Sequence, residues 1–357
     1  MSHHTAALCE LLGITLPVIQ APMAGAQGSA LTLAVSSVGA LGSLPCAMLT
    51  PAQIVAELQR LHEAKRPYNL NFFVHQSAAP DAARESMWRA ALAPYAYELG
   101  VDLAAVPAGA ARSPFSHELA DLIEPFRPPV LSFHFGLPAP ALLARVKSWG
   151  ACVLSSATSV TEALWLQAHG VDAVIAQGVE AGGHRGHFLS DDLDVATHSG
   201  TFGLLPQLVR ALRVPVIAAG GIADATGVAA AQVLGAAAVQ VGTAYLLCPE
   251  STISPLHRAA LKGPDAAYTA LTNLFTGRPA RGIKNRLMRE LGPLNALAPA
   301  FPGAAAAIAC LRAAAEARGS SDFSPLWAGQ NVSGCREIPA AELSLQLAAG
   351  WRLGEPT

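Results

Sequence analysis

Short apolar segments alternate along the chain with alanine- and leucine-rich segments of helical spacing, and this alternation constrains the fold more than any other feature. Apolar runs joined by helices are typical of a parallel sheet built from βα units. The sequence contains eight such runs, at residues 17–21, 40–43, 68–73, 130–135, 151–155, 173–177, 215–219 and 238–242. Eight strands predict an α/β protein with a closed (β/α)8, or TIM, barrel.

Two segments exceed what eight strands and their helices need. The link at residues 74–129 is much longer than one helix requires, and residues 251–357 lie beyond the eighth apolar run. Barrel enzymes place their chemistry at the carboxyl ends of the strands. We therefore expect residues 1–73 and 130–250 to form the barrel. The two extra segments should form a smaller, mainly helical lid or substrate region over that end.

Capping residues mark several of the expected helices. Thr50 followed by Pro51 is typical of an N-cap and a first helical position. A second helix should start at Ser159 and stop at Gly170. The alanine-rich stretch at 304–315 predicts a further helix, because alanine is the best helix former.

Charge, cysteine spacing and hydropathy exclude several classes of protein. The 357 residues include 23 Lys and Arg against 25 Asp and Glu, a formal net charge of −2, which excludes the strongly basic type of nucleic-acid-binding protein. The six cysteines form no C-x-x-C pair, so we expect neither a zinc ribbon nor a disulfide framework, and a cytoplasmic location. Prolines, glycines and polar residues interrupt the apolar stretches at 11–56 and 214–248, so we expect no membrane span. Neither H-E-x-x-H nor H-x-H occurs, and no metal site is expected.

Glycine-bearing turns follow the last three expected strands. Their small residues are Gly182, Gly183, Gly220, Gly221, Gly242 and Thr243. Glycine lets backbone N–H groups approach an anion closely, and a helix N-terminus adds a favourable dipole. In this fold, the loops after the seventh and eighth strands are the usual phosphate site. One Gly-Gly turn alone is more often structural, but three on one rim predict a phosphate-binding site.

Two histidines lie at strand ends where chemistry is expected. His184 belongs to the turn Ala-Gly-Gly-His-Arg-Gly after the sixth strand. Its near-neutral pKa suits proton transfer or stabilisation of an oxyanion, and a surface-loop histidine is the competing interpretation. His134 ends the fourth strand and is a weaker candidate for contact with a substrate. A buried histidine with satisfied hydrogen bonds explains His134 at least as well.

Further candidates follow the first and third strands. Gln20 and Met23 lie in the turn Gln-Ala-Pro-Met-Ala-Gly, and Asn69 and Asn71 belong to the third apolar run. Asn and Gln side chains carry both donor and acceptor, so they can hydrogen-bond the edge of a flat heterocycle. They could equally satisfy loop backbone groups, and the sequence leaves both interpretations open.

Taken together, these motifs resemble the FMN-dependent nitronate monooxygenases, formerly called 2-nitropropane dioxygenases. The resemblance covers roughly residues 12–250 and extends more weakly through residues 326–330. The residues specific to the wider superfamily are 180–186, 220–221 and 240–243. Three motifs narrow the resemblance to this branch: Gln-Ala-Pro-Met at 20–23, Ser-Phe-His-Phe-Gly at 132–136 and Tyr-Leu-Leu-Cys-Pro-Glu-Ser at 245–251.

The resemblance implies a role for each matching residue. The FMN phosphate would be held by Gly182, Gly183, Gly220, Gly221, Gly242 and Thr243, with Gln240 and Val241 in the same segment. The isoalloxazine or ribityl portion would be contacted by Met23, Asn71 and Gln177. His184 matches the active-site histidine beside the flavin.

The resemblance also implies a reaction and leaves alternatives. The family uses O2 to oxidise alkyl nitronates, including propionate 3-nitronate, to a carbonyl compound and nitrite, and His184 would position the nitronate and balance its charge. FMN-dependent enoyl-acyl-carrier-protein reductases and NADH:quinone reductases share the histidine turn, so an NAD(P)H-dependent flavin reductase is the main alternative. A phosphate-ligand-binding barrel with no redox activity is a third, because fold does not fix function.

Overall fold

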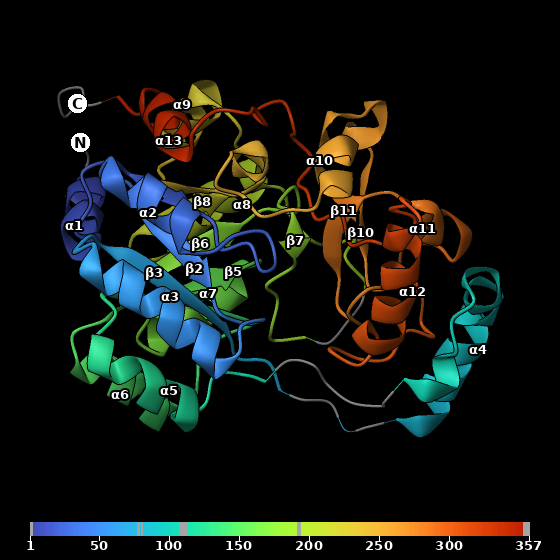
Figure 1. Ribbon diagram of the computed structural model, residues 1–357. Helices are drawn as coiled ribbons and strands as arrows, with labels where there is room; N and C mark the ends of the chain where they lie inside the picture. Colours follow the sequence, from blue (N-terminus) through green and yellow to red (C-terminus); the bar gives the residue numbers. More distant parts are fainter. Residues whose placement is uncertain (1–2, 77–78, 80, 107–112, 191–193, 353–357) are drawn as a thin grey trace.

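A closed barrel of parallel strands forms the larger part of the molecule. The computed structural model describes residues 3–76, 79, 81–106, 113–190 and 194–352. In these residues, eight parallel strands are hydrogen-bonded in the order β1-β9-β8-β6-β5-β4-β3-β2, and a bridge between Ile19 and Leu41 closes the ring. Figure 1 shows helices around these strands. The strands are β1 Val18–Gln20, β2 Gly42–Pro45, β3 Tyr68–Phe73, β4 Val130–His134, β5 Cys152–Ala157, β6 Ala173–Gln177, β8 Val216–Ala219 and β9 Ala238–Val241. The predicted (β/α)8 barrel is confirmed.

Helices on the outside of the barrel join most successive strands. They are α2 Ser29–Ser37, α3 Pro51–Glu63, α6 Pro140–Ser148, α7 Val160–Ala168, α8 Thr201–Ala211 and α9 Ala225–Val233. The predicted caps of α3 and α7 are confirmed, because Thr50 Oγ1 accepts a hydrogen bond from Gln53 N at 3.3 Å and Ser159 Oγ accepts one from Glu162 N at 3.2 Å. Across the described ranges, no helix combines the length and apolar character needed to cross a lipid bilayer.

Apolar side chains close one end of the barrel. Because helices cover the outside of a parallel sheet, its strands are buried on both faces. At the amino-terminal end of the strands, Leu8 and Leu12 of α1 (His3–Leu12) pack in one cluster with Ile175 and Ile217 of the barrel. This packing leaves the carboxyl ends of the strands as the accessible end of the barrel.

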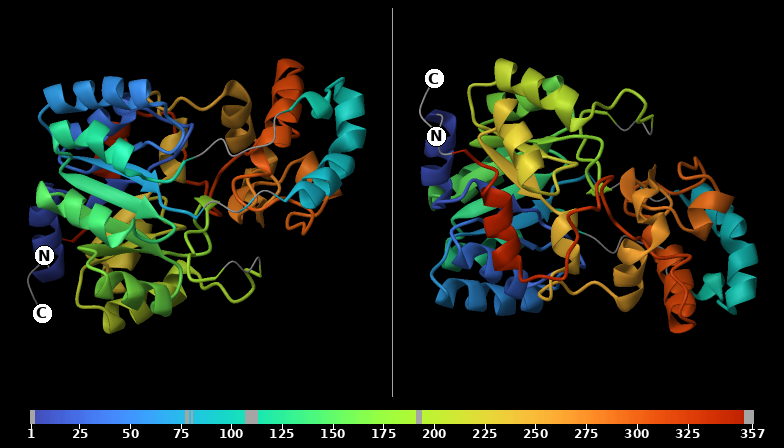
Figure 2. Two further views of the ribbon diagram at one scale, coloured as in Figure 1. Left: turned by 90° about the horizontal axis from the view of Figure 1, so that it is seen from below. Right: turned by 90° about the horizontal axis from the view of Figure 1, so that it is seen from above.

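A second, smaller unit lies beside the carboxyl ends of the strands (Figure 2). It contains α4 Ala82–Leu99, α10 Pro255–Lys262, α11 Arg286–Glu290 and α12 Ala305–Ala317, and α12 is the helix predicted from the alanine-rich stretch. Its strands β10 Thr269–Thr272 and β11 Ala280–Ile283 pair antiparallel, and β11 also pairs with β7 Gly183–His184 from the barrel. Trp88, Leu92 and Leu311 belong to the apolar core of this unit. The shared sheet links the second unit to the turn that carries His184.

Packing contacts refine the division into barrel and lid, which remains a prediction. Helix α4 packs on α12, as expected of two lid segments. Helix α5 (His117–Ile123) instead packs on α3 and α6, and α13 (Ala340–Ala348) packs on α2 and α9. Both helices fall in the ranges that the sequence assigns to the lid, yet both lie against the barrel. The apolar side chains of Ile123 in α5 and Leu343 in α13 are buried in the core of the barrel, which accounts for the position of the two helices.

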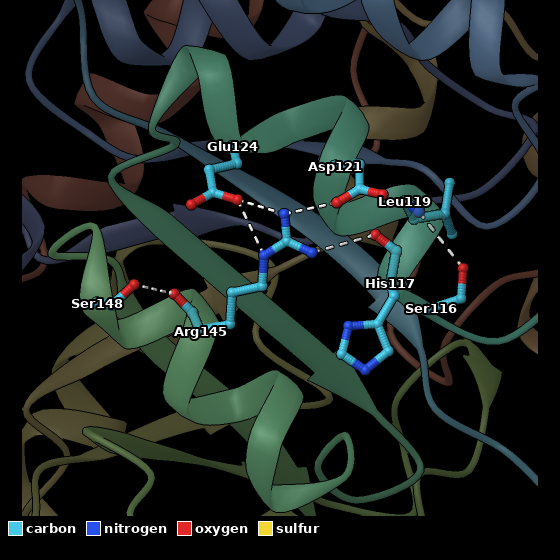
Figure 3. Close-up of polar contacts among 7 residues, drawn as sticks. All are labelled: Ser116, His117, Leu119, Asp121, Glu124, Arg145 and Ser148. Carbon is cyan, nitrogen blue, oxygen red and sulfur yellow. Dashed lines mark hydrogen bonds and ion pairs between the residues drawn. The ribbon is translucent and has the colours of Figure 1, made fainter.

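Arg145 of α6 binds α5 and the turn that follows it, and so holds them against the barrel (Figure 3). Its guanidinium group forms ion pairs with Asp121 of α5, at 2.7 Å, and with Glu124 in the following turn. It also donates a hydrogen bond to the carbonyl oxygen of His117 at 3.4 Å. These two carboxylates raise the pKa of Arg145, so the side chain stays charged. The network fixes α5 against α6 on the outside of the barrel.

Candidate active site

A cavity of about 270 Å³ lies between the carboxyl ends of the barrel strands and the second unit. It collects nearly all of the residues that the sequence singles out. The predicted residues that line it are Met23, Asn71, His134, Gln177, Gly182, Gly183, His184, Gly220, Gly221, Gln240, Gly242 and Thr243. Segments up to 220 residues apart in sequence thus meet at one end of the barrel.

Gln20 and Asn69 do not line the cavity. Val241, which the resemblance places in the segment beside the FMN phosphate, does not line it either. Its side chain is buried in the barrel core, whereas the neighbouring Gln240 faces the cavity. Successive side chains of a strand point to opposite faces, so the two residues cannot both face it. Any contact between Val241 and a ligand would therefore come from its backbone.

The glycine turns form a rim with open space above it. Gly183, Gly220 and Gly221 have φ values of +70°, +117° and +73°, a backbone conformation that residues other than glycine rarely adopt. A Cβ on Gly183 would meet no atom within 4 Å, whereas a Cβ on Gly182 would lie 2.7 Å from the backbone of Ala328. Backbone amides can therefore approach a ligand closely here, as a phosphate requires.

Residues 329–331 brace the same rim from the far end of the chain. The backbone N–H of Gly329 donates to Thr243 Oγ1 at 2.9 Å, and Asn331 Nδ2 donates to the carbonyl oxygen of Gly221 at 3.0 Å. Glu180, the carboxylate nearest the glycine turns, accepts hydrogen bonds from the backbone and hydroxyl of Thr201 at the start of α8. These hydrogen bonds hold the Glu180 carboxylate at the start of α8.

Two residues that line the cavity, Gln240 and His257, each have a buried polar atom with no hydrogen-bond partner among the described residues. In Gln240 this atom is the acceptor Oε1. A buried acceptor without a donor is costly, so a ligand that supplied a donor to Gln240 Oε1 would gain binding energy. Gln240 lines the cavity together with the glycine turns, so a ligand held by those turns would lie near this acceptor.

Aromatic side chains surround His184 at the cavity. The rings of Phe73, Phe301 and Trp327 lie with their centroids 5.5 to 5.8 Å from the imidazole, and that of Phe135 lies at 6.0 Å. The imidazole Nε2 is 3.0 Å from the hydroxyl oxygen of Thr276. His184 therefore presents a polar ring among aromatic side chains, a setting that strengthens electrostatic interactions.

His134 holds the backbone of His184 from the barrel side. Its Nε2 lies 3.1 Å from the carbonyl oxygen of His184, which can only accept, so Nε2 carries the proton. Its Nδ1 lies 2.6 Å from Ser156 Oγ and accepts from that hydroxyl when the ring is neutral. Burial lowers the pKa of His134 to about 4, so the neutral ring is the form present near pH 7. Contact of His134 with a substrate remains a prediction.

Comparison of the sequence with models of known protein families finds one family that matches nearly the whole chain. The family described as nitronate monooxygenase matches residues 5–350. The chain belongs to the nitronate monooxygenase family. It is 42% identical to the nitronate monooxygenase of Paraburkholderia phytofirmans over 350 residues, covering 96% of this chain and 93% of the relative. It is also 42% identical to that of Pseudomonas aeruginosa over 344 residues, covering 94% and 95%.

A solved structure agrees with this assignment. The crystal structure of nitroalkane oxidase from Streptomyces ansochromogenes is 38% identical, has a TM-score of 0.88, and covers 96% of this chain and 97% of that chain. The family resemblance read from the motifs is thus confirmed, and the chain is an enzyme of the nitronate monooxygenase family.

In this member of the nitronate monooxygenase family, Gln177 and Arg185 stabilise the turn around His184. Gln177 Nε2 donates to the carbonyl oxygen of His184 at 2.9 Å, and its Oε1 accepts from Gly186 N at 2.8 Å. The fully buried Arg185 donates to the carbonyl oxygens of Gln177 and Gly178 at 2.8 and 2.7 Å. Burial lowers the pKa of Arg185 to about 10. Gln177 therefore satisfies backbone groups of this loop, and it also lines the cavity.

The cavity extends beyond Trp327 toward α10 and α12. This part is lined by Leu246, Ile253, Ser254, His257, Arg312, Glu316 and Ser324. Glu316 pairs with Arg312 Nε at 2.7 Å and accepts from Ser324 Oγ at 2.6 Å. Burial lowers the pKa of His257 to about 4. Within the described ranges, no group of three or more His, Cys, Asp or Glu side chains is placed to hold a metal ion.

Several residues of the site are missed by the reasoning from sequence. Thr276, Phe301 and Trp327 all come from the second unit, outside the eight strands and their loops. No turn motif or capping signal in the sequence relates Thr276 to His184. Trp327 lies in the segment 326–330 that the resemblance touches only weakly, and this segment is the signal that could have found it.

Proposed function

We propose that the protein is an FMN-dependent monooxygenase that uses O2 to oxidise alkyl nitronates to a carbonyl compound and nitrite. One observation carries the proposal: His184 and three glycine turns line the same cavity in a chain of the nitronate monooxygenase family. The glycine turns supply an anion site, and the histidine lies in the aromatic pocket beside it. A reaction that needs a phosphate-bearing cofactor next to an anionic substrate fits both the glycine turns and the pocket of His184.

The residues present suit FMN. The amides around Gly183 and Gly221, with Thr243, would hold its phosphate, because glycine has no Cβ and the space beside Gly183 is open. The unused acceptor of Gln240 would gain a donor from the bound cofactor. Met23, Asn71 and Gln177 line the part of the cavity where a flat ring system would lie. When bound, FMN supplies the electron-accepting chemistry that these side chains lack.

His184 would position the nitronate and balance its negative charge. Its imidazole is anchored at Nε2 by Thr276 and at its backbone carbonyl by His134 and Gln177. The aromatic rings of Phe73, Phe301 and Trp327 would exclude water, so the interaction with the anion would be stronger than in solution.

A cytoplasmic location completes the proposal. All six cysteines are free, and four of them are buried in apolar surroundings. Free cysteines are typical of proteins of reducing compartments, which supports the proposal.

The test is anaerobic absorbance of the purified, FMN-loaded protein. We expect propionate 3-nitronate or ethyl nitronate to bleach the flavin band and nitrite to accumulate when air is admitted. NADH or NADPH, added in parallel, should leave the band unchanged. Bleaching by a nicotinamide nucleotide alone would instead favour the flavin reductase. A protein that turns over neither class of donor would favour the non-redox binding barrel.

A further inference from the structure

Thr276 lies between β10 and β11 and is buried against the barrel, with 3% of its surface exposed. Its hydroxyl oxygen lies 3.0 Å from Nε2 of His184 and 3.4 Å from the carbonyl oxygen of Arg278. The three groups thus form a chain that runs from the imidazole to a backbone acceptor. Thr276 belongs to the second unit, whereas His184 belongs to a barrel loop.

We propose that Thr276 is a positioning residue that keeps a proton on Nε2 of His184 and fixes the orientation of the imidazole. The inference rests on the proposed function, because it assigns His184 a catalytic task. Thr276 itself touches no reacting atom in this proposal. It acts through His184.

The chemistry of a hydroxyl group supports this direction of the hydrogen bonds. A threonine hydroxyl has one proton to donate and lone pairs that accept. When that proton is directed to the carbonyl of Arg278, which can only accept, the lone pairs face Nε2. Nε2 must then carry a proton of its own. The same chain serves the neutral Nε2–H tautomer and the doubly protonated ring, so the imidazole need not turn when it takes up a second proton.

The backbone keeps the two partners in register. Residues Ala280 and Arg281 of β11 pair with His184 and Gly183 of β7, so the strand that follows Thr276 is hydrogen-bonded to the turn that carries the histidine. His134 and Gln177 fix the carbonyl oxygen of His184 from the barrel. Because the backbone of His184 is fixed, the orientation of its imidazole ring can change only by rotation about the side-chain bonds. Thr276 is the hydrogen-bond partner that the structure shows at Nε2.

Three variants separate positioning from stability. Thr276→Val keeps the shape and removes the hydroxyl, and Thr276→Ser keeps the hydroxyl. Thr272→Val is the matched control, because Thr272 is another buried threonine of the same hairpin, whose hydroxyl accepts from Leu274 N. We expect Thr276→Val to lower kcat/KM for ethyl nitronate by about tenfold or more, within the range seen when a partner that orients a histidine is removed. Thr276→Ser should stay within about twofold of the wild type, and Thr272→Val should retain wild-type turnover.

The decisive measurement is spectroscopic and needs no substrate. In protein labelled with 15N-histidine, and with the His184 signals assigned through His184→Asn, the wild type and Thr276→Ser should show a protonated Nε2. Thr276→Val should lose that signature while retaining bound FMN. Wild-type turnover together with an unchanged Nε2 signal in Thr276→Val would overturn the proposal. If the wild type oxidised no nitronate, the proposed function would fail, and the 15N signals would still decide the role of Thr276.

Discussion

The ring of His134 donates a hydrogen bond from Nε2 to the backbone carbonyl oxygen of His184, 3.1 Å away. Gln177 Nε2 donates to the same oxygen at 2.9 Å, so two side chains from two strands fix one peptide group. Ser156 completes the arrangement from a third strand, at 2.6 Å from His134 Nδ1. The barrel wall thereby sets where the turn of His184 lies, and the histidine ring projects from a rigid base.

Replacing His134 by Leu should impair turnover without removing the cofactor. The variant keeps an apolar side chain of moderate size but loses both hydrogen bonds. Ser156 then lacks its partner, and Gln177 alone hydrogen-bonds the carbonyl oxygen of His184. We expect kcat for ethyl nitronate to fall by about tenfold, and the free energy of unfolding to fall by about 1 to 3 kcal/mol. Steady-state kinetics and urea unfolding measure the two effects. Equal kcat in variant and wild type would show that the turn does not need His134.

His184→Asn should remove most of the turnover while FMN stays bound. Asparagine can still hydrogen-bond Thr276, but its amide carries no positive charge and takes up no proton near neutral pH. We expect kcat for nitronate oxidation to fall by about 100-fold, the scale of a lost general acid or base. Nitrite release in air measures it. The control His169→Asn changes an exposed histidine stacked on Trp165 and should behave as wild type. A fully active His184→Asn protein would exclude His184 from the mechanism.

Acid should destabilise the protein through three buried histidines. Burial lowers the pKa of His134 and His257 to about 4 and that of His187 to about 3, from an ordinary value of about 6.5. Because each pKa is lower in the folded state, the unfolded chain binds these protons first. The stability is fully present above about pH 6.5 and is lost as the pH falls from there toward 4. Each histidine contributes up to about 1.4 kcal/mol per pH unit in that window.

Urea unfolding between pH 7.5 and 5 measures this slope. The His134→Asn variant should have a shallower dependence on pH than the wild type, because one of the three groups no longer takes up a proton on unfolding. His169→Asn alters a histidine that is exposed in the folded protein and should keep the slope. Parallel curves for wild type and His134→Asn would mean that the burial of His134 does not control its protonation.

Much of the barrel follows from local sequence signals. Continuous apolar runs of four to six residues mark parallel strands, because these strands are buried on both faces. Thr50 and Ser159 identify helix starts because an N-cap hydroxyl satisfies backbone donors within the same few residues. The order of the elements then fixes which turns share a rim, so the glycine turns and His184 meet in one cavity as the sequence indicates.

The rest depends on contacts between distant segments. Thr276 reaches His184 only because β11 pairs with β7, a pairing of two short strands that no periodic pattern marks. Helix α5 returns to the barrel because Arg145 and the apolar Ile123 find partners there, although its position in the chain lies within the long insertion. Val241 belongs to a motif that matches the family, but strand alternation turns its side chain into the core.

Gly183→Ala should weaken FMN binding more than it weakens the fold. The left-handed backbone at Gly183, with φ of +70°, costs an alanine about 1 to 2 kcal/mol, and the added methyl group would enter the open space of the cavity. Gly100→Ala is a matched control, because Gly100 has φ of +68°, also meets no atom within 4 Å of its Cβ, and caps α4 away from the cavity. Both variants should lose similar stability as apoproteins, and Gly183→Ala alone should lose FMN affinity. Equal FMN affinity in the two variants would move the cofactor away from this turn.

Gln240→Leu should have opposite effects on the apoprotein and on the FMN complex. In the wild type, Gln240 Oε1 is a buried acceptor with no donor among the described residues, and its desolvation opposes folding until a ligand supplies one. Leucine removes that acceptor, so the melting temperature of the apoprotein should stay equal or rise. The lost hydrogen bond should raise the Kd of FMN about 5- to 30-fold, which corresponds to about 1 to 2 kcal/mol. Gln207→Leu, on the exposed face of α8, should leave the Kd unchanged. A destabilised Gln240→Leu apoprotein with unaltered FMN affinity would assign Gln240 to the fold and not to the cofactor.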